Sequence, residues 1–299
     1  MDLVSYPAFS RVAITGGTHG NELSGVYIVR EMQRQNVAQV GSVSISPILV
    51  NLPAIDACRR YIEKDLNRCF TDALLSTPLT DSSPYELRRA HELNSQLGPK
   101  GSPQAMDLVC DLHNTTSNMG LCFIFDFDCI PSTLPNTYRV IYVDTSKSES
   151  YSVDSVAKHG FAIEVGPQPH GVLRADIYNM MKEAVDHTVD WLNKFNAGTI
   201  FEGGNLEVFV KEKSVDYPRN PETSELTAAI HPQLQDNDFK LLQRGDPIFM
   251  SFTGETVNYE GEELYPFFIN ECAYYEKKIA FHLAKKKMLT IPPISLKKD

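Results

Sequence analysis

The sequence predicts an α/β protein with a largely parallel sheet covered by helices on both faces, followed by a smaller β-rich domain. Up to residue 195, short apolar runs alternate with amphipathic runs of helical period. Several apolar runs are continuous, as in parallel strands buried on both faces. After residue 196, short strand-like runs separated by turn residues replace this pattern. We therefore expect one domain over residues 1–200 and a second over residues 201–299.

The first domain is expected to begin with a strand, a glycine-rich turn and a helix. Strands are predicted at residues 12–14, 42–50, 106–112, 121–127, 139–143 and 161–165. The first helix starts at Leu23 and has an apolar face. A second is predicted from Pro84 to Leu97, because Ser83 can cap it and Glu86 is the matching carboxylate. The third, residues 173–195, has one apolar face, formed by Leu173, Ile177, Met180, Ala184 and Trp191.

Turn and loop residues separate these elements. Residues 59–68 are polar and cation-rich without a helical period, and residues 71–83 have the composition of a surface connection. In the second domain, strands are predicted at residues 206–210, 227–230, 248–252 and 265–269. The basic tail, residues 285–299, is expected to be frayed.

Composition narrows the class of protein. The 299 residues are 42% hydrophobic, and 28 Lys and Arg against 38 Asp and Glu give a net charge of −10. This balance argues against general binding to nucleic acid or anionic membranes, although arginines inside a cleft can still attract an anionic substrate. The first ten residues lack a signal-peptide pattern, and no apolar run approaches membrane-spanning length. The cysteines form no CxxC pair, so we expect reduced thiols in the cytoplasm: Cys58, Cys69, Cys110, Cys122, Cys129 and Cys272.

His19 and Glu22 suggest a metal site. They lie three residues apart in the turn that joins a strand to a helix, so both side chains can point to one side. His113, which ends another apolar run, is the best third ligand, with Asp111 as a possible partner of the imidazole. On spacing alone, a hydrogen-bonded turn histidine beside a helix-capping carboxylate is the more common explanation of these two residues.

Three further positions carry possible chemistry. Glu164 lies inside an apolar strand, where a carboxylate is costly without a partner, so it is either a salt-bridged core residue or functional. Asn67 and Arg68 could grip a substrate carboxylate, because a guanidinium offers two parallel donors. Both can also be solvated loop residues. The glycines of the first turn form neither GxGxxG nor a Walker loop, so a phosphate site is not predicted.

Five motifs occur together in a known order and resemble those of the aspartoacylase family of zinc amidohydrolases. They are Gly16-Gly17-Thr18-His19-Gly20-Asn21-Glu22, Asp65-Leu66-Asn67-Arg68, Asp111-Leu112-His113-Asn114-Thr115-Thr116-Ser117-Asn118, Glu164-Val165-Gly166-Pro167-Gln168-Pro169 and Ala273-Tyr274-Tyr275-Glu276-Lys277. The resemblance covers nearly the whole chain. It implies a fold like that of zinc carboxypeptidases, with the β-rich domain covering the cleft.

The resemblance also implies a role for each matching residue. His19, Glu22 and His113 match the ligands of one Zn²⁺ per subunit. Glu164 matches the catalytic carboxylate, and Arg60 the arginine that polarises the substrate carbonyl. Asn67 and Arg68 match the pair that holds the α-carboxylate, and Tyr274 matches a substrate-contacting tyrosine. The implied reaction hydrolyses an N-acyl amino acid to a carboxylic acid and a free amino acid. Relatives are oligomers, so a homo-oligomer is expected.

One departure from the family pattern bears on the substrate. Family members that cleave N-acetylaspartate carry an arginine ten residues before the catalytic glutamate, and here that position is Asp154. An acidic group there would repel a second carboxylate. The chain thus resembles the aminoacylase-3 branch, which deacetylates N-acetyl aromatic amino acids and S-conjugated N-acetylcysteines (mercapturates). Lys278, which matches a substrate-side lysine of aspartoacylase, favours the opposite specificity.

Other functions fit parts of the sequence. Aspartoacylase activity is the first alternative, and a peptide-cleaving metallocarboxypeptidase is the second. A zinc-binding interaction protein without catalysis is a third, which the combination of Glu164, Arg60 and Arg68 disfavours.

Overall fold

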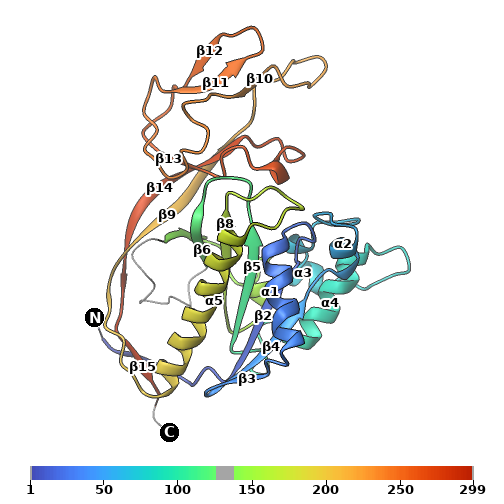
Figure 1. The fold of residues 1–299 in the computed structure, drawn as a ribbon, viewed down its shortest axis with the longest axis vertical. Helices are drawn as coiled ribbons and strands as arrows, with labels where there is room; N and C mark the ends of the chain where they lie inside the picture. The colour runs from blue at the N-terminus through green and yellow to red at the C-terminus, as the bar shows by residue number, and fades with distance from the viewer. Residues whose placement is uncertain (1, 126–137, 298–299) are drawn as a thin grey trace.

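A mixed sheet forms the body of the protein (Figure 1). The computed structural model describes residues 2–125 and 138–297. Within these residues the sheet has ten strands, in the order β13 (Tyr265–Phe267), β14 (Phe281–Ile291), β9 (Gly204–Val215), β7 (Arg139–Tyr142), β6 (Gly120–Phe125), β8 (His159–Gly166), β5 (Leu108–Asn114), β2 (Arg11–Gly16), β4 (Val43–Leu49) and β3 (Gln39–Val40). The predicted strands of the first domain are therefore confirmed, except that the last two residues of the strand predicted at 121–127 lie outside the described residues. Cys129, one of the predicted reduced thiols, also lies outside them.

Helices cover both faces of the sheet, as the continuous apolar strands predicted. α1 (Leu23–Arg34) and α5 (Ala175–Asn196) pack on one face, and α4 (Tyr85–Leu97) packs on the other. Neighbouring residues of β2 show how a strand serves two cores: Val12 and Ile14 point toward α1 and α5, whereas Ala13 points toward α4. Shorter helices lie near α4, namely α2 (Leu52–Asp56), α3 (Asp72–Leu75), η1 (Leu66–Arg68) and η2 (Val153–Val156).

Two details of the helices differ from expectation. In α5, Ile177, Ala184 and Trp191 are buried as predicted, but Leu173 precedes the helix and is 45% exposed, and Met180 is 36% exposed. The buried face of α5 therefore includes fewer of the predicted apolar residues than the sequence pattern suggested. The first turn of α4 is not closed by the predicted cap of Ser83. Instead the buried Glu86 carboxylate accepts hydrogen bonds from backbone N–H groups of an earlier loop, including those of Ile62 at 2.7 Å and Lys64 at 3.1 Å.

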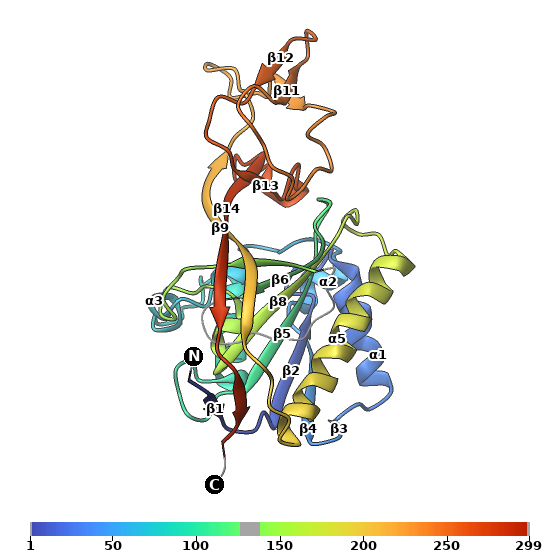
Figure 2. The same cartoon turned by 90° about the vertical axis from the view of Figure 1, so that its left-hand side faces the viewer.

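The C-terminal half forms a second lobe at one end of the sheet. Two long antiparallel strands, β9 and β14, run from the lower part of the molecule into this lobe (Figure 2). The lobe also contains β10 (Ala228–Ile230), β11 (Pro247–Ser251), β12 (Thr256–Asn258) and η3 (Cys272–Tyr274). The predicted strands of this region are thus present. β7 pairs with β9, so the main sheet continues from one lobe to the other.

The prediction of a frayed tail was wrong. Residues 281–291 form β14, which pairs with β9 along its whole length, and β15 (Ile294–Leu296) pairs with β1 (Val4–Tyr6) near the N-terminus. Lys285 and Lys286 are accommodated because Glu212 and Glu207 lie within 3.5 Å and 3.1 Å on β9. Cross-strand ion pairs of this kind let a basic run stay in a sheet.

Of the helices in the described ranges, none is both long enough and apolar enough to cross a membrane.

Candidate metal centre and substrate cleft

The three predicted ligands meet at the ends of β2 and β5. His19 and Glu22 lie in the turn between β2 and α1, and His113 is the penultimate residue of β5. His19 Nδ1 is 2.7 Å from Glu22 Oε1 and 3.2 Å from His113 Nδ1, and His113 Nδ1 is 2.9 Å from Glu22 Oε2. All three side chains are buried. Two imidazole nitrogens and one carboxylate therefore converge on one small volume.

The glycines of this turn allow close packing of backbone against backbone. A Cβ on Gly20 would lie 2.0 Å from the Ala54 carbonyl carbon, and one on Gly16 would lie 2.4 Å from the Gly25 oxygen. The glycines thus bring the turn against α2 and against α1 itself. This packing fixes the turn that carries His19 and Glu22.

Carboxylates behind the imidazoles orient both rings. Asp111 Oδ2 is 2.6 Å from His113 Nε2, and Asp65 Oδ1 is 3.1 Å from His19 Nε2. Each imidazole that donates Nε2–H to its carboxylate presents a bare Nδ1 toward Glu22. Asp65 is well suited to this role: burial would raise its pKa, but His19 and Arg60 outweigh burial and hold the pKa far below the usual value.

The donor set fits a divalent metal ion. The ligand atoms of His19, Glu22 and His113 lie within 4.8 Å of one another, and no other such group of His, Cys, Asp and Glu occurs among the described residues. Tetrahedral zinc with bonds near 2.0–2.1 Å needs ligand atoms about 3.3 Å apart, close to the spacing seen. Two histidines and a glutamate also form the protein ligand set of catalytic zinc sites that keep one position open for water.

Glu164 lies next to this cluster. β5 and β8 pair in parallel with His113 opposite Glu164, so both side chains project from the same face of the sheet. Glu164 is 8% exposed, and burial, reinforced by the negative charge of Glu22, raises its pKa well above the usual value. A carboxyl group with a raised pKa can take up and release a proton near neutral pH. No ion pair within the described ranges involves Glu164, so the structure does not show the salt bridge that the core interpretation required.

The predicted substrate residues line the same cleft, Arg60 from the loop before η1 and Asn67 and Arg68 from η1 itself. Arg60 is ion-paired, with Nη1 at 3.2 Å from Glu22 and Nη2 at 3.4 Å from Asp65. Asn67 accepts the Val153 backbone N–H at 3.2 Å, which fixes its amide. Arg68 stacks on Tyr151, with its guanidinium carbon 4.3 Å from the ring centre.

The second lobe closes one side of the cleft. Tyr274 lines the cavity, and burial raises the pKa of its hydroxyl. Lys277 also lines it and is 3.1 Å from Asp65. Lys278, the lysine singled out in the sequence, is exposed and is not among the lining residues. The cleft-facing lysine of this segment is therefore the neighbouring one.

Glu271 was missed by the sequence analysis. It is 3% exposed and accepts hydrogen bonds from the hydroxyl of Thr115 and, at 2.8 Å, from the backbone N–H of Thr116. These two threonines follow His113, so Glu271 ties the second lobe to the loop after the metal ligands. No local pattern identifies it, because its partners are distant in sequence.

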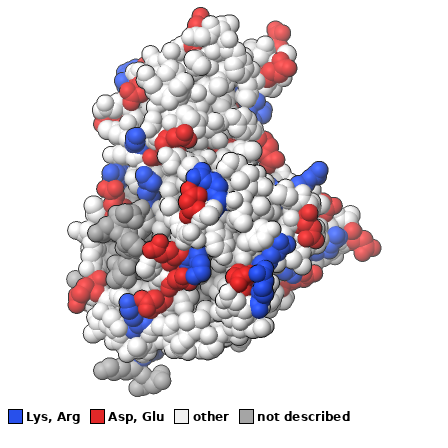
Figure 3. Space-filling view, viewed as in Figure 1, with Lys and Arg blue, Asp and Glu red and all other residues white. Residues whose placement is uncertain are grey.

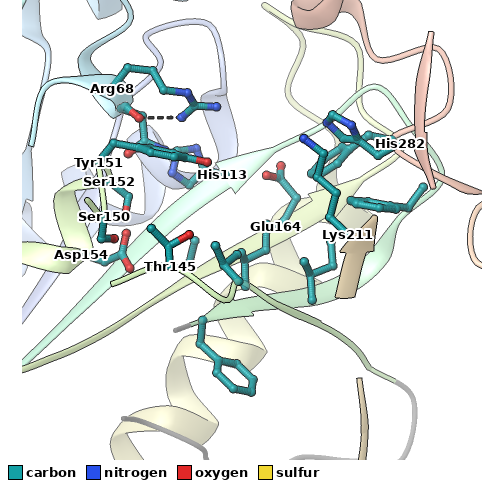
Figure 4. A pocket seen from close by; sticks show the side chains of 18 of the residues that line it. Arg68, His113, Thr145, Ser150, Tyr151, Ser152, Asp154, Glu164, Lys211 and His282 are labelled. Atoms are coloured by element: carbon teal, nitrogen blue, oxygen red, sulfur yellow. Dashed lines mark hydrogen bonds between the residues drawn. The ribbon is translucent and has the colours of Figure 1, made fainter. Parts of the chain in front are cut away.

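The cleft is a cavity of about 550 Å³ with a polar end and an apolar wall. Ile124, Ile141, Val210, Phe267, Phe268 and Ile279 contribute apolar side chains. Figure 4 shows Arg68, Tyr151, Asp154 and His113 on one side of Glu164, with Lys211 and His282 on the other. Asp154 is 7% exposed and lines the cavity, as its position in the sequence suggested.

Charge is distributed differently inside the cleft and on the outer surface. Figure 3 shows acidic and basic side chains intermingled over the visible face, without a field of one sign. The cleft gathers four cations, Arg60, Arg68, Lys211 and Lys277, together with the carboxyl groups of Asp144, Asp154 and Glu164. Cations that can attract an anionic substrate are thus present in one cleft.

Relatives match this chain over more than nine tenths of their own length. Residues 8–192 match the succinylglutamate desuccinylase/aspartoacylase catalytic domain, and residues 204–286 match the AstE/AspA barrel-sandwich hybrid domain. The zebrafish protein named N-acyl-aromatic-L-amino acid amidohydrolase (carboxylate-forming) B is 59% identical over 100% of both chains. Its human namesake is 48% identical over 94% of this chain and 92% of its own. Mouse aspartoacylase is 42% identical over 98% of this chain and 97% of its own.

Solved structures show the same fold. Murine aminoacylase 3 superposes with a TM-score of 0.91 at 42% identity, over 97% of this chain and 99% of its own. Succinylglutamate desuccinylase from Vibrio cholerae shares the fold at a TM-score of 0.62 and 14% identity, over 95% of this chain and 86% of its own. With both lobes matched and the predicted metal ligands together in one cleft, the chain belongs to the succinylglutamate desuccinylase/aspartoacylase family.

Proposed function

We propose that this protein is a zinc-dependent amidohydrolase that deacylates N-acyl amino acids, with N-acetyl aromatic amino acids and S-conjugated N-acetylcysteines as its substrates. The observation that carries the proposal is the buried His19–Glu22–His113 cluster beside Glu164. The names of the zebrafish and human relatives support the reaction class and the aromatic preference.

The side chains divide the work as follows. His19, Glu22 and His113 would hold the zinc ion, which would supply the Lewis acidity that acidifies water and polarises a carbonyl oxygen. Glu164 accepts the proton of the attacking water and later donates it to the leaving nitrogen, a role that its raised pKa suits. Arg60 places positive charge next to the position where the oxyanion develops. No covalent acyl-enzyme is required.

Substrate orientation comes from the loop around η1 and from the second lobe. Arg68, supported by Asn67, binds the α-carboxylate through its planar pair of donors. Tyr274 contacts the substrate from the second lobe. The apolar wall of the 550 Å³ cavity provides room and contact area for an aromatic side chain. Asp154 disfavours the short acidic side chain of N-acetylaspartate.

Acetate release from N-acetyltyrosine and N-acetylaspartate, with and without a chelator, tests the proposal. We expect turnover of the tyrosine derivative, its loss with the chelator and its recovery on addition of zinc. A preference for N-acetylaspartate would instead favour aspartoacylase activity and would refute the role of Asp154. Unchanged turnover after verified removal of the metal would refute zinc dependence.

Three expectations stay predictions. We propose the division into residues 1–200 and 201–299, with the second domain covering the cleft. A cytoplasmic location and a homo-oligomeric state rest on the sequence and on the family resemblance.

A further inference from the structure

Lys211 is a cation in the cleft to which the reaction gives no role. It is in β9, lines the cavity and lies beside His282, across Glu164 from Arg68 (Figure 4). Two lysines of the neighbouring strand β14, Lys285 and Lys286, are paired with glutamates. No ion pair within residues 2–125 and 138–297 includes Lys211, so its charge is available to a ligand.

Two of the four cations that line the cleft, Arg68 and Lys211, form no ion pair among the described residues. Arg60 is balanced by Glu22 and Asp65, and Lys277 also contacts Asp65. For the described residues, no carboxylate lies within ion-pair distance of Arg68 or Lys211. Partial burial, followed by the charge of Arg68, lowers the pKa of Lys211, as expected when two cations share a cleft and neither is ion-paired. A ligand with two anionic groups would relieve this repulsion at both ends.

His282 adds a hydrogen-bond donor next to Lys211. Its Nδ1 is 2.8 Å from the Ser214 hydroxyl, and its ring packs 5.2 Å from the centres of both the Phe267 and Tyr274 rings. Burial and the nearby cations, Lys211 first among them, lower the pKa of His282 to about 3, so the ring is neutral at neutral pH. A neutral imidazole that accepts the serine proton at Nδ1 carries its own proton on Nε2 and can donate it to an anion.

We propose that Lys211, assisted by His282, forms a second anion subsite that binds a carboxylate at the far end of the substrate side chain. The proposal rests on the proposed function, in which Arg68 holds the α-carboxylate. It names a substrate class: N-acyl amino acids whose aromatic or S-linked side chain ends in an acidic group. Asp154 lies on the Arg68 side of Glu164, so a side-chain carboxylate that approached Asp154 would be repelled, whereas one that reaches Lys211 is bound (Figure 4).

Matched substrates and variants test this subsite. N-acetyl-4-carboxy-L-phenylalanine is compared with its neutral 4-carbamoyl analogue, using zinc-loaded wild type, Lys211→Met, Lys211→Arg and Lys213→Met. Lys213→Met is the control, because Lys213 is an exposed lysine of the same strand that does not line the cavity. We expect Lys211→Met to lose about tenfold in kcat/KM on the acid, mainly through KM, with the amide nearly unchanged. Lys211→Arg should restore most of the loss, and Lys213→Met should match wild type.

A binding measurement separates recognition from turnover. The calorimetric Kd for the product 4-carboxy-L-phenylalanine should rise about tenfold in Lys211→Met, and that of the 4-carbamoyl product should not. Equal effects on acid and amide, or no effect on either, would overturn the subsite while wild-type hydrolysis of N-acetyltyrosine still upheld the proposed function. If wild type released acetate from none of these substrates, the proposed function would fail, and the subsite with it.

Discussion

Asp111→Asn tests how the metal site is oriented. The Asp111 side chain is fully buried; Oδ2 is 2.6 Å from His113 Nε2, and Oδ1 accepts the hydroxyls of Thr15 at 2.7 Å and Thr18 at 2.8 Å. In the asparagine variant, the amide oxygen can keep the two threonine bonds. The amide nitrogen then faces His113 Nε2 and donates to it, which moves the imidazole proton to Nδ1 and blocks the atom that faces Glu22.

The size of the effect follows from this geometry. Removing a carboxylate that orients a metal-binding histidine typically costs 10- to 100-fold in metal affinity. Because Asp111 is fully buried and its contact is short, we expect the upper end, about 100-fold, or about 2.7 kcal/mol of binding free energy. The stability of the metal-free protein should fall by only about 1 kcal/mol, since the threonine bonds persist.

Competition against a chromophoric zinc chelator measures the affinity, and urea unfolding of the metal-free protein measures the stability. Asp107→Asn is the matched control: Asp107 immediately precedes β5, accepts the Ser10 and Arg11 N–H groups at 2.9 Å, and lies outside the cleft. It should lose stability and keep zinc affinity. A folded Asp111→Asn protein that binds zinc within about twofold of wild type would refute the tautomer argument.

Other predictions follow from packing, charge and the substrate loop. Gly25→Ala should lower the free energy of unfolding by about 2 kcal/mol in urea, because its Cβ would lie 2.7 Å from Leu112 Cβ; a neutral effect would show that α1 can move off β5. Burial raises the pKa of Asp238 to about 7, so the folded protein keeps a proton that the unfolded chain loses above about pH 4. Stability should therefore fall by up to about 4 kcal/mol as pH rises from 4 to 7 and then level off. Asp238→Asn should flatten that slope, and an unchanged slope would assign it to other groups. Arg68→Lys should raise KM for N-acetyltyrosine about tenfold with kcat largely retained, whereas a loss confined to kcat would contradict carboxylate binding.

Much of the first lobe could be predicted because its signals are local. Apolar runs, glycine turns and helix periodicity specify β2, α1, β5, β8 and α5 without knowledge of distant contacts. The position of His113 beside Glu22 could not be derived in this way, because spacing along one chain does not say which strands are neighbours. The sequence offered His113 as the best third ligand, and the ordered motifs of the family resemblance supported that choice.

The errors occurred where distant contacts override local composition. Residues 281–291 contain three consecutive lysines, which suggested a frayed tail, yet pairing with β9 and its glutamates makes them a strand. Glu86 seemed to be part of a helix cap, but its carboxylate serves a loop that precedes it by more than twenty residues. Glu271 and Lys211 lie in no recognisable sequence motif, because their positions become informative only once the two lobes form the cleft.

Zinc content and turnover, measured together on Glu164→Gln, test the central claim most directly. If His19, Glu22 and His113 hold the metal and Glu164 transfers the proton, the variant should retain about one zinc per chain. Its kcat on N-acetyltyrosine should fall by at least about a hundredfold, within the range for loss of a general base. A variant that keeps its zinc and hydrolyses N-acetyltyrosine at the wild-type rate would contradict the account.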